Sequence, residues 1–368
     1  MDKVQVTIIG AGVIGLAVAR ELAGYFPEIL VLEKNDSFGR ETSSRNSEVI
    51  HSGIYYPADS FKARLCVEGS RQLYNYCCAH DIPHKRLGKL IIASGQEDVA
   101  KISDLHQRGI RNGVGGLELI DAERLAVLEP RSLGVAALWS PNTGIINSHV
   151  LMSRLYGDAV GRGVLFAFNS EVASIQRQAD GYEVGVLQDD FRVLSDIVIN
   201  AAGLNSDKIA ELAGLDVDGL GCRLNYCKGD YFSYSGTSPV SRLLYPVPGE
   251  HLSGLGVHAT LDLAGQLRFG PDTEDVTTLD YTVDERKKKG FFQAASRLIP
   301  GLEESRFMPH MAGIRPKIKG PGVQDFVIRD EKPNGFPNFI NLVGIESPGL
   351  TSCLAIAKTV RSLVDEGL

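Results

Sequence analysis

A glycine-rich turn near the N-terminus constrains the fold of this chain more than any other feature. The short apolar run Val4 to Ile9 is typical of a buried parallel strand, and Gly10-Ala11-Gly12-Val13-Ile14-Gly15 follows it directly. Gly10 permits a tight turn, Gly12 lets the backbone approach a pyrophosphate, and Gly15 lets a helix pack closely on the strand. Apolar residues at helical spacing follow the turn. The pattern therefore predicts a strand, a turn and a helix that together bind a dinucleotide.

The second strand of this unit supports that prediction. A further apolar run, Ile29 to Leu32, ends at Glu33. A carboxylate at this position accepts hydrogen bonds from ribose hydroxyls, and it disfavours a nicotinamide cofactor that carries a 2′-phosphate. By itself the glycine turn permits either NAD or FAD.

Length and charge narrow the class of protein. A chain of 368 residues exceeds what one hydrophobic core usually supports, so two domains are expected. The net charge is −7, and acidic and basic residues are mixed along the chain. Because phosphate backbones require a concentrated basic surface, nucleic acid is not an expected partner.

The cysteines indicate neither a metal site nor a disulfide framework. The six cysteines form no Cys-x-x-Cys pair and have no histidine at zinc-like spacing, so we expect reduced, mostly buried thiols. No signal peptide and no run of 18 apolar residues is evident. These features predict a cytoplasmic protein, with peripheral contact at the inner membrane left open.

The order of the predicted elements indicates that the first domain is discontinuous. Residues 36–60 form a polar loop, residues 222–310 are mainly strand-like, and the chain ends in an amphipathic helix over 350–364. We predict an FAD-binding domain from 1–84, 146–215 and 308–368, and a substrate-binding domain from 85–145 and 216–307. The predicted fold is α/β (α+β over the two domains): a Rossmann-like βαβ domain with an inserted mixed β-sheet domain.

This split layout favours FAD over NAD, because simple nicotinamide enzymes usually keep their nucleotide half contiguous. The helix after Gly349 also favours FAD, since its positive N-terminus would stabilise the negative charge of a reduced flavin. Small residues ending a strand at 201–203 let a backbone pass close to a cofactor. We predict the following cofactor-binding residues: Gly10, Gly12, Val13, Ile14, Gly15, Glu33, Lys34, Thr42, Ser43, Ser44, Asn46, Ser47, Val172, Ala201, Ala202, Gly203, Gly313, Arg315, Ser347, Pro348, Gly349, Leu350 and Thr351.

Several further motifs point to one family. They are Arg45 to Tyr56 (RNSEVIHSGIYY), Lys62 to Gly69, Gly88-Lys89-Leu90-Ile91, Lys228 to Tyr231, Gly256-Val257-His258, Ala312 to Lys317, and Gly344 to Ser352. They span nearly the whole chain. The sequence resembles the D-amino-acid-oxidase-like FAD-dependent oxidoreductase superfamily, and within it most closely the L-2-hydroxyglutarate dehydrogenase/oxidase-like family. It departs from the family pattern at Glu48 and Ala58, and residues 100–120 and 236–242 match poorly.

The resemblance implies oxidation of a 2-hydroxy acid, most closely L-2-hydroxyglutarate to 2-oxoglutarate, with hydride transfer to N5 of FAD. Arg315, fixed beside a proline, suits a clamp for the substrate carboxylate. His51 and His258 are both candidate bases, because imidazole titrates near working pH. Tyr55 and Tyr56 are predicted to contact the substrate, and Lys228 to meet a distal carboxylate.

The sequence also permits three other functions. Glycerol-3-phosphate dehydrogenases share the serines before an Ile-His-x-Gly segment, but they usually carry an arginine where this chain has Tyr55. Glycine or sarcosine oxidases form a second alternative, and a flavin-binding scaffold without turnover forms a third. The sequence leaves open the electron acceptor (quinone or oxygen), covalent attachment of FAD and the oligomeric state.

Overall fold

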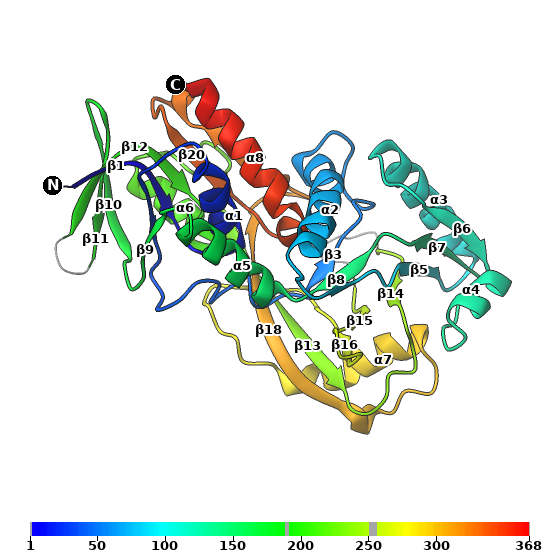
Figure 1. Cartoon of the computed structure of the whole chain (residues 1–368). Helices are drawn as coiled ribbons and strands as arrows, with labels where there is room; N and C mark the ends of the chain where they lie inside the picture. The colour runs from blue at the N-terminus through cyan, green and yellow to red at the C-terminus, as the bar shows by residue number, and fades with distance from the viewer. Residues whose placement is uncertain (1, 188–190, 250–255, 368) are drawn as a thin grey trace. The chain divides into compact units, whose positions relative to one another are not determined.

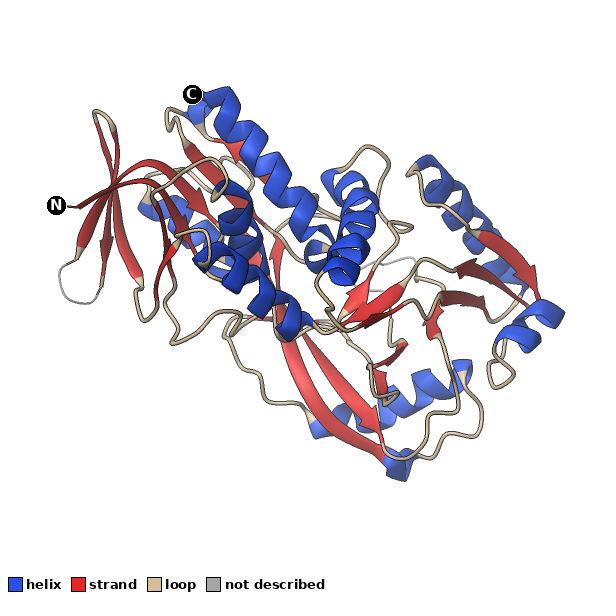
Figure 2. Cartoon of the chain, in the orientation of Figure 1, coloured by secondary structure: helices blue, strands red, loops and turns tan. Residues whose placement is uncertain are grey.

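The computed structural model describes residues 2–187, 191–249 and 256–367, and they divide into two compact units. Unit 1 comprises residues 1–44, 148–226 and 315–368, and unit 2 comprises residues 45–147 and 227–314. Both units interleave helices and strands along the chain (Figures 1 and 2). This division differs from the predicted domain ranges chiefly at residues 45–84, which belong to unit 2.

Unit 1 is built on an eight-stranded sheet whose central strands are parallel. Strand β1 (Asp2–Ile9) lies between β2 (Ile29–Leu32) and β12 (Arg192–Asn200), and every residue of β2 is buried. The other strands are β9 (Leu165–Ala167), β10 (Val172–Gln178), β11 (Gly181–Val186), β19 (Val327–Asp330) and β20 (Phe339–Val343). Unbroken apolar runs such as β2 suit a parallel sheet that is covered on both faces.

Four helices pack on this sheet. They are α1 (Val13–Leu22), α5 (Ser148–Val160), α6 (Ser206–Leu212) and α8 (Gly349–Gly367). Helix α1 contacts both α5 and α8, whereas α6 contacts β10, β12 and β20. The strand–helix–strand unit predicted from the glycine turn is therefore present, and the two-domain α/β class is confirmed.

Unit 2 contains a mixed nine-stranded sheet. Its order is β17 (Glu274–Val276), β13 (Leu224–Tyr234), β16 (Leu267–Phe269), β15 (Ala259–Leu261), β14 (Leu243–Pro246), β5 (Lys89–Ala93), β7 (Ala136–Ser140) and β6 (Glu118–Asp121), with β18 (Phe307–Ile318) paired to β13. Strands β13 and β18 cross the boundary between the units. A three-stranded sheet of β3 (Val49–Ile50), β8 (Gly144–Ile146) and β4 (His84–Lys85) completes the strands of the unit.

The helices of unit 2 are α2 (Phe61–Ala79), α3 (Gln96–Arg111), α4 (Ala122–Leu128) and α7 (Lys288–Leu298). Helix α2 begins after its N-cap Ser60, whose Oγ accepts a hydrogen bond from Ala63 N at 3.1 Å. The sequence analysis missed α3. Acidic residues in its first turn, arginines in its last turn and the buried residues Ile102 and Leu105 form a regular helical pattern.

Candidate active site

The glycine turn has the close contacts that its sequence predicted. Gly10 adopts φ +104°, and a Cβ there would lie 2.6 Å from the carbonyl oxygen of Ala201. A Cβ on Gly15 would lie 1.9 Å from the carbonyl oxygen of Gly10. The amide of Val13 at the start of α1 donates to Ser43 Oγ at 2.9 Å. Side chains are thus excluded where the turn, the helix and the end of β12 meet.

A cavity of about 490 Å³ opens beside this turn in unit 1. Ten predicted cofactor residues line it: Gly10, Gly12, Glu33, Lys34, Thr42, Ser43, Val172, Ala201, Ala202 and Gly203. The prediction missed several other lining residues, namely Ile9, Leu32, Asn35, Gly39, Arg40, Glu41, Ser170, Glu171, Leu204, Asn205, Lys208, Ile209, Glu211 and Leu212. The apolar side chains of the cavity suit a flat base, and its polar residues suit a ribose and phosphates.

Glu33 holds the end of β2 against the glycine turn. Its Oε2 accepts a hydrogen bond from Ala11 N at 2.8 Å, and its Oε1 accepts from Asn35 N and Asn35 Nδ2 at 2.9 and 2.8 Å. The side chain is 7% exposed and lines the cavity. A carboxylate offers about four acceptor positions, so these contacts leave capacity for a ribose hydroxyl. Lys34 is tied to Glu41 by an ion pair of 2.8 Å.

Other predicted cofactor residues of unit 1 do not line this cavity. They are Val13, Ile14, Gly15, Ser44, Arg315, Ser347, Pro348, Gly349, Leu350 and Thr351. Gly344 adopts φ +71°, and a Cβ there would lie 2.5 Å from Ile318 Cγ1, so β18 approaches the turn before α8 closely. Helix α8 begins at Gly349, and Arg315 lies on β18.

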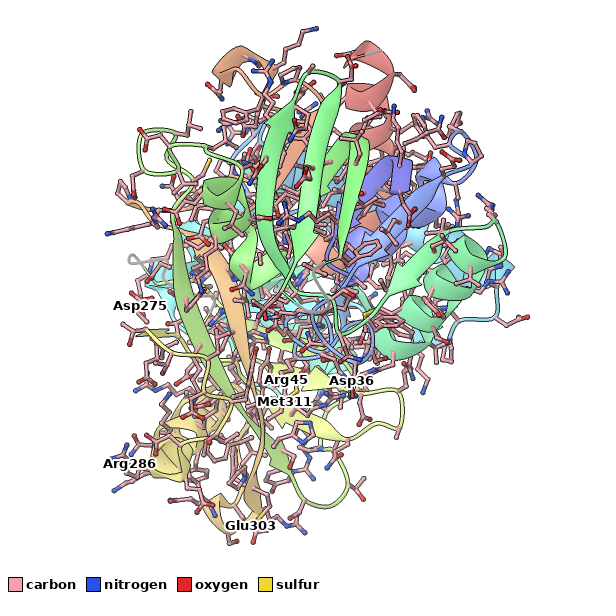
Figure 3. All side chains as sticks on the ribbon, turned by 90° about the vertical axis from the view of Figure 1, so that its left-hand side faces the viewer. Asp36, Arg45, Asp275, Arg286, Glu303 and Met311 are labelled. Atoms are coloured by element: carbon pink, nitrogen blue, oxygen red, sulfur yellow. The ribbon has the colours of Figure 1, made fainter. Side chains whose placement is uncertain are left out.

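Asn46, Ser47 and Gly313 lie in unit 2. Asn46 Oδ1 accepts from Glu48 N at 2.8 Å, and Ser47 Oγ is 3.0 Å from Tyr231 Oη. A Cβ on Gly313 would lie 2.2 Å from the carbonyl oxygen of Arg45, a residue marked in Figure 3. Strand β18 therefore lies directly against Arg45, within the polar loop predicted at residues 36–60.

Unit 2 brings both candidate histidines into one cluster. The rings of His258 and Tyr245 stack with centroids 4.0 Å apart and an interplanar angle of 16°. Lys89 Nζ lies 4.8 Å from the Tyr245 ring centroid and 4.5 Å from that of Tyr55. The charges of Lys89 and His258 both act on His51. We name His51, Tyr55, Lys89, Tyr245 and His258 the histidine cluster.

Burial dominates the electrostatics of this cluster. It lowers the pKa of His51 to about 3, with smaller contributions from the charges of Lys89 and His258. Burial also lowers the pKa of Lys89 to about 7, and raises the pKa of the Tyr55 and Tyr245 hydroxyls. Near neutral pH the cluster therefore holds a neutral imidazole at His51 beside an ammonium that loses its proton easily.

His258 has a defined tautomer. Its Nδ1 lies 3.0 Å from the carbonyl oxygen of Gly256. A carbonyl can only accept, so Nδ1 carries the proton and the imidazole lone pair is on Nε2. A histidine in this tautomer can accept a proton at Nε2.

The sequence analysis missed Lys89 and Tyr245 as site residues. Lys89 is 1% exposed and opens β5, whose other four residues are also buried. One lysine at the start of an otherwise apolar buried strand is a signal that could have identified it. Tyr245 is fully buried in β14, but nothing in its local sequence distinguishes it from an ordinary core tyrosine.

Contacts within unit 2 hold Lys228 and the backbone of Tyr55 and Tyr56, three of the predicted substrate residues. Lys228 Nζ donates to the Thr282 carbonyl at 2.5 Å and lies 3.9 Å from Asp230 Oδ1. The carbonyls of Tyr55 and Tyr56 accept from Arg108 Nη1 and Asn112 Nδ2 at 3.1 and 3.0 Å. Helix α3 and its C-cap Asn112, which the sequence analysis missed, therefore support the backbone of Tyr55 and Tyr56.

Comparisons with known proteins identify the family. The model of the family described as FAD dependent oxidoreductase (DAO) matches residues 5–363. The chain belongs to this family of FAD-dependent oxidoreductases. It is an enzyme whose cofactor is FAD, as the glycine turn and the split layout predicted.

Relatives and solved structures agree with this assignment. The chain is 38% identical to the mitochondrial L-2-hydroxyglutarate dehydrogenase of Arabidopsis thaliana, over 98% of this chain and 83% of the relative. It is 30% identical to the L-2-hydroxyglutarate dehydrogenase of Indibacter alkaliphilus, over 97% of each. The FAD-bound L-alpha-glycerophosphate oxidase of Mycoplasma pneumoniae has a TM-score of 0.90 at 27% identity, covering 99% of this chain and 95% of its own.

Within residues 2–187, 191–249 and 256–367, no three histidine, cysteine or acidic side chains group as metal ligands. No helix in the same ranges is long and apolar enough to cross a bilayer.

Proposed function

We propose that this enzyme oxidises L-2-hydroxyglutarate to 2-oxoglutarate. The observation that carries the proposal is the histidine cluster, in a chain whose full-length relatives at 30–38% identity are named L-2-hydroxyglutarate dehydrogenases. Oxidising a 2-hydroxy acid requires a base for the hydroxyl proton, a cation for the carboxylate and a hydride acceptor. The chain offers histidines for the first requirement and Arg315 for the second.

The residues of unit 1 fit FAD. The glycine turn excludes side chains where a pyrophosphate approaches, and the cavity beside it is lined by Glu33, Ser43 and apolar side chains. We assign the adenosine and diphosphate to this cavity, and the positive N-terminus of α8 to the flavin edge that becomes negative on reduction. When bound, FAD supplies the acceptor for the hydride from Cα of the substrate.

We assign the hydroxyl proton to His258. Its Nδ1–H is held by the Gly256 carbonyl, so the proton is taken at Nε2. His51, whose pKa is lowered to about 3, stays neutral and positions the hydroxyl by hydrogen bonding. Arg315 binds the carboxylate next to the reacting carbon through its guanidinium.

A panel of substrates tests the activity. The holoenzyme is mixed anaerobically with L-2-hydroxyglutarate, D-2-hydroxyglutarate, L-2-hydroxypentanoate, glycerol 3-phosphate, glycine and sarcosine, and bleaching of the flavin is followed by stopped flow. We expect the fastest bleaching with L-2-hydroxyglutarate. Faster bleaching by glycine or sarcosine would contradict the proposal. Reoxidation by a quinone analogue or by oxygen then identifies the acceptor.

Glycerol 3-phosphate is the second candidate substrate, because the oxidase from Mycoplasma pneumoniae has a TM-score of 0.90 and 27% identity. Bleaching by glycerol 3-phosphate but not by L-2-hydroxyglutarate would select it. The base is tested separately with His258→Asn and His51→Asn. We expect the first to slow flavin reduction by roughly 10²- to 10⁴-fold and the second to slow it less. The reverse order would move the base to His51.

A further inference from the structure

Among the residues that the structure describes, Lys89 has no carboxylate partner. It is 1% exposed, and none of the aspartates and glutamates that the structure describes pairs with it. In the sheet it lies opposite Leu243 of β14 and Ser140 of β7. The nearby Cys66 provides no counter-ion, because burial raises the pKa of its thiol to about 12. A buried ammonium without an anion is costly, so an anion bound beside Lys89 would stabilise its charge.

The groups around Lys89 are donors. The Tyr55 and Tyr245 rings hold its ammonium by cation–π contacts at 4.5 and 4.8 Å. Both tyrosine hydroxyls are buried, and neither has a hydrogen-bond partner among the described residues. Burial keeps both phenols protonated by raising their pKa. An ammonium and two unsatisfied hydroxyls complement a small anion.

We propose that Lys89 and the hydroxyls of Tyr55 and Tyr245 form a subsite for the second carboxylate of the substrate, the one remote from the oxidised carbon. The subsite belongs to the histidine cluster, because Tyr245 stacks on His258 and the charge of Lys89 acts on His51. This inference rests on the proposed function. It predicts that the enzyme prefers a dicarboxylic over a monocarboxylic 2-hydroxy acid.

The inference replaces Lys228 in that role. The ammonium of Lys228 already donates to the Thr282 carbonyl and has Asp230 at 3.9 Å and Asp280 at 4.0 Å. A second carboxylate would have to compete with these acidic groups. Lys89 has no such competitor among the described residues.

A pair of substrates that differ only at the remote end tests the subsite. L-2-Hydroxypentanoate carries a methyl group where L-2-hydroxyglutarate carries its second carboxylate. In Lys89→Met, kcat/KM for L-2-hydroxyglutarate should fall by roughly 10- to 100-fold, and kcat/KM for L-2-hydroxypentanoate should stay unchanged or rise. Tyr245→Phe should reduce the ratio of kcat/KM for L-2-hydroxyglutarate to that for L-2-hydroxypentanoate by roughly 5- to 10-fold. Lys101→Met is the control, because Lys101 lies on α3, is 42% exposed and pairs with Asp98.

Equal losses with both substrates would overturn the subsite, and so would an unchanged preference. Binding of glutarate and of butyrate to the oxidised holoenzyme, followed through the flavin spectrum, gives a readout without turnover. We expect Lys89→Met to weaken the binding of glutarate but not that of butyrate. Lys89→Arg should restore part of the difference in affinity between the two ligands. If Lys89→Met fails to bind FAD, the binding of glutarate and butyrate to Tyr245→Phe tests the subsite instead. A wild-type enzyme that L-2-hydroxyglutarate does not bleach would instead refute the proposed function.

Discussion

The charge of Lys89 should be visible in stability as well as in specificity. Replacing Lys89 by Met removes a buried ammonium and keeps an apolar side chain of similar length in β5. The side chain is surrounded by Tyr55, Tyr245, Cys66 and His51, none of which is an anion near neutral pH. We therefore expect Lys89→Met to be more stable than the wild type at pH 7.

The size of the stabilisation follows from the lowered pKa of Lys89. Burial lowers the pKa of Lys89 from its ordinary value of 10.5 to about 7. At about 1.4 kcal/mol per unit, this places an upper bound of about 5 kcal/mol on the cost of keeping the charge in the folded state. Losing the two cation–π contacts destabilises the variant by roughly 1–3 kcal/mol and offsets part of this gain. We expect a net stabilisation of at most about 2–4 kcal/mol at pH 7.

The dependence on pH isolates the charge from packing. The folded pKa lies below the unfolded one, so the folded protein binds fewer protons than the unfolded chain between about pH 7 and 10.5. Wild-type stability therefore gains with rising pH over this window, by up to about 1.4 kcal/mol per pH unit from this group. The advantage of Lys89→Met should shrink steadily from pH 7 to pH 10.

Urea unfolding of both proteins at four pH values in this range, at one fixed FAD concentration, measures the difference. Lys101→Met serves as the control, because its exposed ammonium should give a difference that barely changes with pH. An advantage of Lys89→Met that stays constant between pH 7 and 10 would refute the argument, since the lysine would then titrate normally in the folded state.

Three further predictions concern the cofactor turn, the thiols and the histidines. Gly15→Ala should lose bound FAD and lower the melting temperature, because its Cβ would lie 1.9 Å from the Gly10 carbonyl oxygen; full flavin content in the purified variant would contradict this. Cys78 is the exposed thiol among the six, so native protein should react with one equivalent of iodoacetamide, checked by intact mass. The His51 ring should take up no proton between pH 5 and 8, because its folded pKa of about 3 lies below this range; ring nitrogen chemical shifts typical of an imidazolium at pH 5 would show otherwise.

Local rules predicted the nucleotide-binding half well. The glycine turn, Glu33 and the two apolar runs are close in sequence, and each follows from backbone sterics or strand burial. The bounds of α2 and β20 were equally accessible, since caps and apolar periodicity define them. Much of the cavity wall was not accessible, because residues 204–212 reach it only through the packing of α6.

The substrate-binding residues were harder to predict than the nucleotide-binding ones, and Lys228 and Lys89 illustrate the physical reason. Lys228 and Lys89 both stand in family-like motifs, and both are almost fully buried, at 7% and 1% exposed. Their difference lies in contacts across the sheet and loops: Lys228 meets Asp230 and Thr282, whereas Lys89 meets two aromatic faces. Sequence gives the charge but not its partner, and the partner decides whether a buried cation is already neutralised or still able to bind an anion. A pattern-based assignment of the distal carboxylate therefore had no means of choosing between Lys228 and Lys89.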